Sequence, residues 1–330
     1  MTTGPTQAGT PAAEDLVWVP GASFLMGADA FYPEEGPTEQ ATVEGLWMDR
    51  HPVTNAEFAE FIEASGYVTV AERPLRAEDY PGALPELLVP GGLVFQATTG
   101  PVDLRDYTNW WAYVPGASWR TPRGSQSSLD GLDDHPVVQV AYEDAEAYAA
   151  WRGAALPTEA EWEHAARGGL KGAAFCWGDE PYPDGRQLAN TWQGEFPWQN
   201  LVLDGYEGTS PVGSFPANGY GLVDMAGNVW EWTSDWWQQK RTGATTGCCA
   251  PSNPRGATQA ESLDPNAPLE PFGRKVIKGG SHLCAPNYCL RFRPAARQPE
   301  SVETSTCHIG FRCVRHDAAA PSAPSGPSEI

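Results

Sequence analysis

Two cysteines five residues apart, Cys284 and Cys289, impose the strongest local constraint on how this 330-residue chain folds. In a strand an odd offset points two side chains to opposite faces, and on a helix residues five apart diverge by more than a right angle. The sulfurs therefore meet only if the backbone turns between them, and Pro286 and Asn287 favour turns. Three arginines follow within eight residues of Cys289. A thiol pair on a bend beside cations indicates a disulfide, a reactive thiol pair or a soft-metal site.

The sequence around these cysteines carries a recognisable pattern. Residues 279–297 read GGSHLCAPNYCLRFRPAAR, residues 310–313 read GFRC, and residues 156–169 read LPTEAEWEHAARGG. Together these motifs resemble the formylglycine-generating enzymes, the sulfatase-modifying factors, over roughly residues 15–315. The resemblance implies an α+β fold: a single compact domain with little regular secondary structure, of the formylglycine-generating-enzyme and C-type-lectin-like kind. Non-catalytic relatives share this fold, and the two cysteines distinguish the oxidases from them.

The resemblance also implies a chemistry. In that family both cysteines bind one Cu(I) and oxidise a substrate cysteine with O2. We therefore expect a copper-dependent oxidase that converts the cysteine of a Cys-x-Pro-x-Arg segment in a sulfatase polypeptide to formylglycine, with a thiol reductant supplying the remaining electrons. Cu(I) is soft and accepts two thiolate ligands, which leaves room for a third sulfur from the substrate.

Three further residues, Ser281, Tyr288 and Trp230, occupy positions that line the reaction site of that family alongside Cys284 and Cys289. The hydroxyls of Ser281 and Tyr288 could position O2, water or the substrate backbone. Trp230 lies in a tryptophan-rich segment, so ordinary core packing is a strong alternative interpretation of that residue.

Two loops carry the oxygen atoms that a hard cation prefers. From spacing alone, Asp and Asn in glycine-rich loops are more typical of Asx turns than of metal sites. The resemblance implies structural calcium, because these positions align with the two calcium sites of the family. The first set is Asn190, Thr191, Asp204 and Tyr206, and the second set is Asp224, Gly227, Val229 and Glu231.

Other interpretations stay open at this point. His282 and His308 lie near cysteines and could complete a zinc site, although zinc normally takes four ligands at short paired spacings, which this chain lacks. A structural disulfide between Cys284 and Cys289 is a second alternative. A non-catalytic, lectin-like binding module is the alternative function. An iron-dependent, sulfoxide-forming enzyme on the same fold would need a His-x3-His-x-Glu triad, and the six histidines do not supply that spacing.

Charge and hydropathy exclude several partners. A formal net charge of −21 argues against binding to nucleic acid or to an anionic membrane surface. No run approaches the ~18 apolar residues of a membrane-spanning helix. The first 15 residues lack the basic and apolar regions of a signal peptide. We therefore expect a cytoplasmic protein whose cysteines stay largely reduced.

The chain divides into one folded body and two tails. Residues 1–14 and 317–330 are small, polar and proline-containing, which predicts disordered tails around a catalytic domain at residues 15–316. Short apolar runs at 16–20 and 24–27 predict the strands of a hairpin, and residues 42–48 predict a further strand. Helices are predicted over residues 56–65 with Thr54 or Asn55 as the cap, over residues 142–151, and after Pro157, where Thr158 and Glu161 form a capping box.

Overall fold

A computed structural model describes residues 15–82, 84–239, 251–268 and 270–316. The two predicted tails lie outside these residues, as do Cys248 and Cys249. Within the described part of the chain, no helix is both long enough and apolar enough to cross a membrane.

The three predicted helices are confirmed. They are α1 (Asn55–Ser65), α2 (Tyr142–Trp151) and α3 (Glu159–Arg167). Thr54 and Thr158 each accept a hydrogen bond from the backbone of a glutamate three residues later, and that glutamate accepts from the backbone of the threonine. These capping boxes satisfy amides that the first turn leaves unpaired. The starts of α1 and α3 were predictable because a capping box involves only neighbouring residues.

Within the described residues, the strands form four small sheets, and short 3-10 helices lie in the connections. The central sheet has the strand order β10-β7-β8-β9, in which β10 runs parallel to β7 and the other neighbours are antiparallel. The strands of this sheet are β7 (Trp230–Trp236), β8 (Arg274–Lys278), β9 (Arg297–Ser301) and β10 (Ile309–Gly310). A second sheet joins β1 (Leu16–Val19), β4 (Leu46–Asp49) and β11 (Val314–Arg315). The other two sheets are two-stranded ribbons. One pairs β2 (Ala22–Met26) with β3 (Glu39–Val43), and the other pairs β5 (Gly91–Phe95) with β6 (Trp111–Pro115).

The predicted hairpin of the first two strands is wrong. Strand β1 pairs with β4, and β2 pairs with β3, so the two strands are consecutive parts of one side of a bent ribbon. The other side bends at Gly45, which splits the strand predicted over residues 42–48 into β3 and β4. The bends touch: a Cβ atom on Gly21 would lie 2.6 Å from the backbone nitrogen of Gly45. Glycine permits this approach because it has no side chain.

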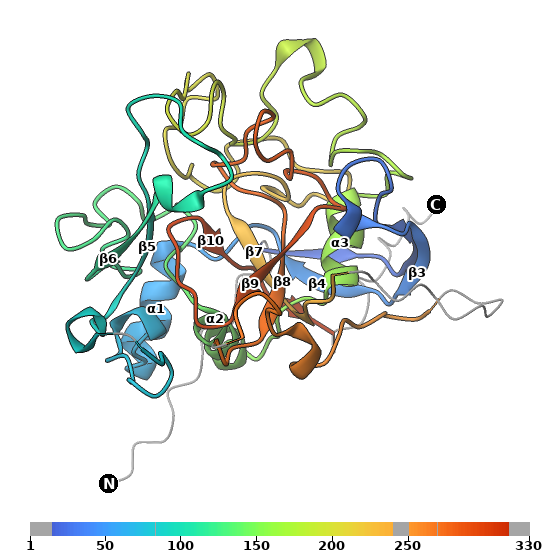
Figure 1. Ribbon diagram of the computed structural model, residues 1–330. Helices are drawn as coiled ribbons and strands as arrows, with labels where there is room; N and C mark the ends of the chain where they lie inside the picture. The colour runs from blue at the N-terminus through green and yellow to red at the C-terminus, as the bar shows by residue number, and fades with distance from the viewer. Residues whose placement is uncertain (1–14, 83, 240–250, 269, 317–330) are drawn as a thin grey trace, which may run out of the picture.

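The main core lies between the three helices and the central sheet (Figure 1). Phe311 packs edge to face against both Phe58 of α1 and Tyr148 of α2, and Trp162 of α3 is fully buried in the same cluster. The segment between α3 and β7 contains no strand and forms the loops at the top of the view (Figure 1). Both Cys284 and Cys289 belong to this core cluster, so the thiol pair is buried in the main core.

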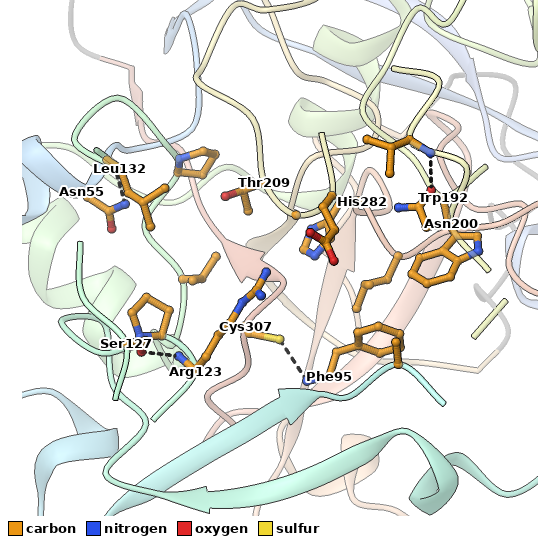
Figure 2. A pocket seen from close by; sticks show the side chains of 18 of the residues that line it. Asn55, Phe95, Arg123, Ser127, Leu132, Trp192, Asn200, Thr209, His282 and Cys307 are labelled. Carbon is orange, nitrogen blue, oxygen red and sulfur yellow. Dashed lines mark hydrogen bonds between the residues drawn. The ribbon is translucent and has the colours of Figure 1, made fainter. Parts of the chain in front are cut away.

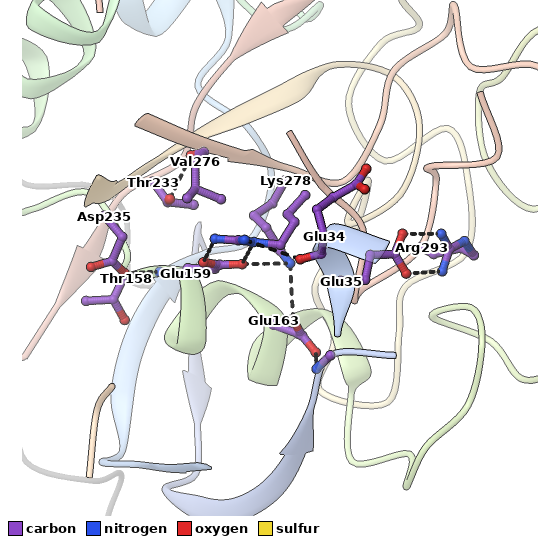
Figure 3. A network of polar contacts seen from close by, with 12 residues as sticks. Glu34, Glu35, Thr158, Glu159, Glu163, Thr233, Asp235, Val276, Lys278 and Arg293 are labelled. Carbon is purple, nitrogen blue, oxygen red and sulfur yellow. Dashed lines mark hydrogen bonds and ion pairs between the residues drawn. The ribbon is translucent and has the colours of Figure 1, made fainter. Parts of the chain in front are cut away.

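A buried charge network fixes α3 to the sheet (Figure 3). The Lys278 ammonium lies 3.1 Å from Glu163 and 3.6 Å from Glu159, and Arg297 binds both oxygens of Glu159 at 2.7 and 2.9 Å. Buried charges are tolerated when they are paired in this way. Because Lys278 is the last residue of β8, the network fixes the point at which the chain enters the cysteine bend.

Candidate functional site

The cysteine bend begins where β8 ends. Gly279 and Gly280 follow Lys278 with φ angles of +94° and +71°, a region that favours glycine. A Cβ atom on Gly280 would lie 2.9 Å from backbone atoms of Arg291 and Phe292. The two ends of the segment 280–291 are therefore in contact, and the segment forms a closed loop that contains both cysteines.

This loop brings the two sulfurs together as the sequence predicted. The Sγ atoms of Cys284 and Cys289 are 3.2 Å apart, and both side chains are buried. A disulfide would need a separation of about 2.05 Å, so the cysteines are free thiols here. The backbone N–H of Ser281 donates to Cys284 Sγ at 3.4 Å, and the Ser281 hydroxyl accepts from the backbone N–H of Leu283 at 3.2 Å. Two adjacent sulfurs are a donor set that soft Cu(I) accepts.

The two thiols differ in acidity. Burial raises the pKa of Cys284 well above its usual range, so Cys284 keeps its proton. Its S–H can then donate to Cys289, and this hydrogen bond is the main cause that lowers the pKa of Cys289 to about 7. The Arg291 guanidinium, whose Nη1 lies 3.9 Å from Cys289 Sγ, lowers that pKa further. Cys289 is therefore the thiol that ionises first near neutral pH.

Tyr32 and Glu34 hold Arg291 in place, and the sequence did not predict that these two residues belong to the site. Glu34 Oε1 accepts from Arg291 Nη2 at 2.6 Å, and the Tyr32 ring lies 3.9 Å from the guanidinium carbon. The Tyr32 hydroxyl accepts from the backbone N–H of Leu290 at 3.0 Å. More than 250 residues separate these partners along the chain, so no local spacing could have indicated the contacts.

Aromatic residues form the other side of the bend. The Tyr288 ring stacks on Phe196, with ring centroids 4.6 Å apart and an interplanar angle of 4°, and meets Trp110 edge to face at 5.4 Å. Tyr288 stays 38% exposed, and burial of the rest of its ring raises the pKa of its hydroxyl to about 12. Its phenol is therefore a protonated, solvent-accessible hydrogen-bond donor beside the thiol pair.

A pocket of about 640 Å³ continues from this aromatic group (Figure 2). Phe95 and Trp192, which pack against Phe196, line the pocket together with Leu283, the residue before Cys284. Arg123 and His282 also point into the pocket (Figure 2). Burial lowers the pKa of His282 to about 4, so its imidazole is neutral. The pocket thus combines apolar walls with a small number of polar groups, as ligand sites usually do.

Trp230 is a core residue, and the histidines near the cysteines do not form a zinc site among the described residues. Trp230 is 2% exposed and packs in the core cluster that contains both cysteines, and its backbone N–H donates to the carbonyl oxygen of His308. His282 Nδ1 contacts the carbonyl oxygen of Asn228 at 2.9 Å. Among the described residues, no group of three or more His, Cys, Asp or Glu side chains is arranged to hold a metal ion. The zinc interpretation therefore has no support from this arrangement.

The first predicted calcium set is assembled in the structure. Asp204 accepts hydrogen bonds from the backbone N–H groups of Thr191 and Tyr206 at 3.1 and 3.0 Å, so the loops at 190–191 and 204–206 meet. The Asn190 side-chain oxygen is buried and has no hydrogen-bond partner among the described residues. Buried oxygens are normally satisfied, so this atom has acceptor capacity that suits a hard cation.

The second predicted calcium set fits less well. Burial raises the pKa of Asp224 to about 6, and the nearby Glu231 carboxylate contributes to this rise. Both oxygens of Glu231 already accept from Arg312, at 2.7 and 2.8 Å, and one also accepts from Trp162 Nε1 at 2.7 Å. A cation bound beside Gly227 and Val229 would therefore share the Glu231 carboxylate with a guanidinium.

Comparisons with known proteins show the family and the fold of this chain. Residues 2–317 match the family model described as sulfatase-modifying factor enzyme 1-like domain. The chain is 55% identical to a formylglycine-generating enzyme of Mycobacterium tuberculosis, over 91% of this chain and 97% of that protein. It is 42% identical to an inactive C-alpha-formylglycine-generating enzyme 2 of Mus musculus, over 90% of this chain and 84% of that protein. Among solved structures, PvdO from Pseudomonas aeruginosa has a TM-score of 0.59 at 24% identity, covers 95% of this chain and 99% of its own, and shows the same fold.

Proposed function

Since this chain belongs to the sulfatase-modifying factor enzyme 1-like family, we propose that it is a formylglycine-generating oxidoreductase that acts on sulfatases. The substrate is the cysteine of a Cys-x-Pro-x-Arg segment, the oxidant is O2, and a thiol supplies two electrons. The observation that carries the proposal is the pair of free, buried sulfurs 3.2 Å apart on a bend fixed at both ends. A lectin-like binding module would need no such pair.

The reaction balances with these reactants. The substrate side chain –CH2–SH loses its sulfur as hydrogen sulfide, and its carbon becomes the aldehyde –CHO. One oxygen atom of O2 enters the aldehyde and the other leaves as water. Two thiols each give up one proton and one electron and join as a disulfide. No further oxidant or reductant is required.

Cys284 and Cys289 would hold one Cu(I), which when bound supplies the chemistry that joins a substrate thiolate to O2. The other residues of the site bind and orient. The hydroxyl of the partly exposed Tyr288 and the hydroxyl of the buried Ser281 would donate to O2, water or the substrate backbone. Trp230 would close the site from the core side and exclude water. The acidic surface of a chain with net charge −21 would favour the arginine of the substrate segment.

Calcium would act as a structural ion at the first set of oxygens. Asn190 and Asp204 supply side-chain oxygens, and the backbone near Thr191 and Tyr206 completes the set. The loops concerned lie between α3 and β7, where the described chain has no strand to order them. The second set stays a proposal of the same kind, with Asp224 as its available carboxylate. Free thiols at all five described cysteines support a reducing compartment, which is why we also propose a cytoplasmic location.

The test uses purified protein with Cu(I), O2, a dithiol and a Cys-x-Pro-x-Arg peptide. Mass spectrometry should show conversion of the peptide thiol to an aldehyde, and a sulfide assay should show release of hydrogen sulfide. A Ser-x-Pro-x-Arg peptide should bind without conversion, because a hydroxyl is a poor ligand for a soft metal. Failure to convert the cysteine peptide, with copper bound and the protein folded, would refute the proposal and favour the binding module.

Copper stoichiometry tests the role of the cysteines directly. About one Cu(I) per chain should bind tightly, and Cys284→Ser or Cys289→Ser should each abolish tight binding, because two thiolates are the fewest ligands that hold this soft ion. X-ray absorption should count two sulfurs in the resting protein and three after the cysteine peptide is added. If both single variants keep the full copper content, these cysteines are not the ligands.

A further inference from the structure

A second opening lies beside Arg291, the residue that contacts Cys289. It is a cleft of about 240 Å³ between the turn at residues 33–35, the loop at 264–266 and the strands β8 and β9. Glu34 and Arg291 line it, and Asn266 lies at an exposed position on its wall. We call this opening the arginine cleft. It shares no lining residue with the 640 Å³ pocket that adjoins the aromatic side of the bend.

The arginine cleft is separated from Cys289 by a single side chain. Arg291 lines the cleft, and its Nη1 atom lies 3.9 Å from Cys289 Sγ. Tyr288, by contrast, contacts Phe196 and Trp110 on the side of the larger pocket. A peptide bound along Tyr288 would therefore leave the arginine cleft open, so a second molecule could bind beside Arg291 at the same time.

The charges of the described residues that line this cleft are balanced. Arg274 pairs with Asp264 at 2.7 Å and Arg291 pairs with Glu34 at 2.6 Å, so each guanidinium is balanced by one carboxylate. On a protein with net charge −21, such a balanced cleft opposes the approach of an anion less than the surrounding surface does. Glu34 and its neighbour Glu35 diverge, with Glu35 directed at Arg293 and Glu34 directed away from it (Figure 3).

Arg291 keeps donors available for a ligand. A guanidinium has five N–H groups. One nitrogen donates to Glu34, another contacts Cys289, and Nε is buried without a hydrogen-bond partner among the described residues. Because Nε is buried, a ligand in the cleft would instead accept from the terminal N–H groups of Arg291 that neither Glu34 nor Cys289 uses.

We propose that the arginine cleft admits the small anionic thiol that reduces the site, and that Arg291 binds this thiol beside Cys289. The inference rests on the proposed function, which requires two electrons from thiols for each peptide converted. Two such thiols lose two protons and two electrons and form one disulfide, while O2 provides one oxygen atom to the aldehyde and one to water. The volume of 240 Å³ equals that of roughly eight water molecules, which limits the reductant to a small molecule.

The experiment compares three reductants of similar size at saturating peptide: 3-mercaptopropionate, which is anionic, 2-mercaptoethanol, which is neutral, and cysteamine, which is cationic. Glu34→Gln leaves Arg291 without its carboxylate partner. This variant should raise the ratio of the KM for cysteamine to the KM for 3-mercaptopropionate about five- to tenfold, because one unit charge close to a ligand contributes on the order of a kcal/mol. The KM for 2-mercaptoethanol and for the peptide should change little.

The matched control is Glu303→Gln. It changes the net charge by the same amount in a separate cleft, lined by Tyr80 and Phe272, and should leave the KM ratio unchanged. A second variant, Asn266→Trp, places a large side chain on the exposed wall of the arginine cleft. It should raise the KM for all three thiols at least threefold and leave the KM for the peptide unchanged.

The inference stands only if each test variant that folds behaves in this way. Equal effects of Glu34→Gln on all three thiols, or unchanged thiol KM values in Asn266→Trp, would overturn it. If Glu34→Gln does not fold, Asn266→Trp decides alone. If the parent protein converts the peptide but the variants keep its thiol selectivity, only the proposed binding of the thiol in the arginine cleft is refuted. If no reductant supports conversion, the proposed function is refuted as well.

Discussion

Removing the carboxylate of Glu35 should destabilise the protein strongly, because it would leave a buried guanidinium unpaired. The side chains of Glu35 and Arg293 are both fully buried and form a two-pronged pair, with one hydrogen bond of 2.8 Å and a second, shorter one. Arg293 Nε also donates to the carbonyl oxygen of Leu290 at 2.8 Å, one residue after Cys289. The pair therefore supports the far end of the cysteine bend.

The expected magnitude follows from the cost of an uncompensated buried charge. Breaking such a pair from one side costs about 3–5 kcal/mol. With an unfolding entropy of about 2.1 cal/mol/K per residue over roughly 300 folded residues, a loss of about 4 kcal/mol lowers the Tm by about 6 °C. The double variant Glu35→Ala with Arg293→Met removes both charges, so it should be more stable than Glu35→Ala alone.

Urea unfolding of the parent protein, of Glu35→Ala, of Arg293→Met and of the double variant measures the coupling between the two side chains. Glu63→Ala, at an exposed position of α1, is the control and should change the free energy of unfolding by less than about 0.5 kcal/mol. If Glu35→Ala costs less than about 1 kcal/mol, or if the double variant is the least stable of the set, the reasoning about an unpaired buried arginine is wrong.

Three other predictions concern the metal, the pH response and the bend. Chelation should lower the Tm if calcium binds only the folded state, by the equivalent of about 2.7 kcal/mol at a hundredfold excess over Kd, and Asp204→Ala should blunt this response in a thermal melt. Burial raises the pKa of Asp144 from 3.8 to about 6, so the folded protein takes up a proton before the unfolded chain does. The contribution of Asp144 to stability should therefore grow, by up to about 3 kcal/mol, as the pH falls from about 7 to about 4, and Asp144→Asn should flatten this dependence in urea unfolding at several pH values. Gly280→Ala should reduce copper content without unfolding the protein, because a Cβ atom there would push on the backbone of Arg291; normal copper content would contradict the close approach seen here.

Local features of the sequence predicted local features of the fold. The capping boxes at Thr54 and Thr158 set the helix starts, and the turn residues between Cys284 and Cys289 predicted that the sulfurs meet. The pairing of β1 and β2 was not predictable in this way. Two apolar strands separated by a short turn suggest a hairpin, but close packing of Gly21 on Gly45 bends both sides of a longer ribbon instead.

The same limit applies to the candidate site. The cysteines, Ser281 and Tyr288 lie within nine residues of one another, so the sequence motif indicated them together. Glu34 and Phe196 contact the same bend from distant parts of the chain, and nothing in their own neighbourhoods predicts these contacts. Long-range charge pairs depend on how the loops pack, which a single sequence does not reveal.

The second sheet has a consequence for when the protein becomes active during synthesis. Strand β4 lies between β1, at the start of the described chain, and β11, at its end, and Val314 pairs with Met48. The cysteine bend likewise needs Tyr32 from the beginning and β10 from the end, because β10 pairs with Trp230. Structures dominated by contacts between distant residues form late and slowly. A growing chain would carry both cysteines before it had the strands that position them, so the thiol pair should stay inactive until the last strands have left the ribosome.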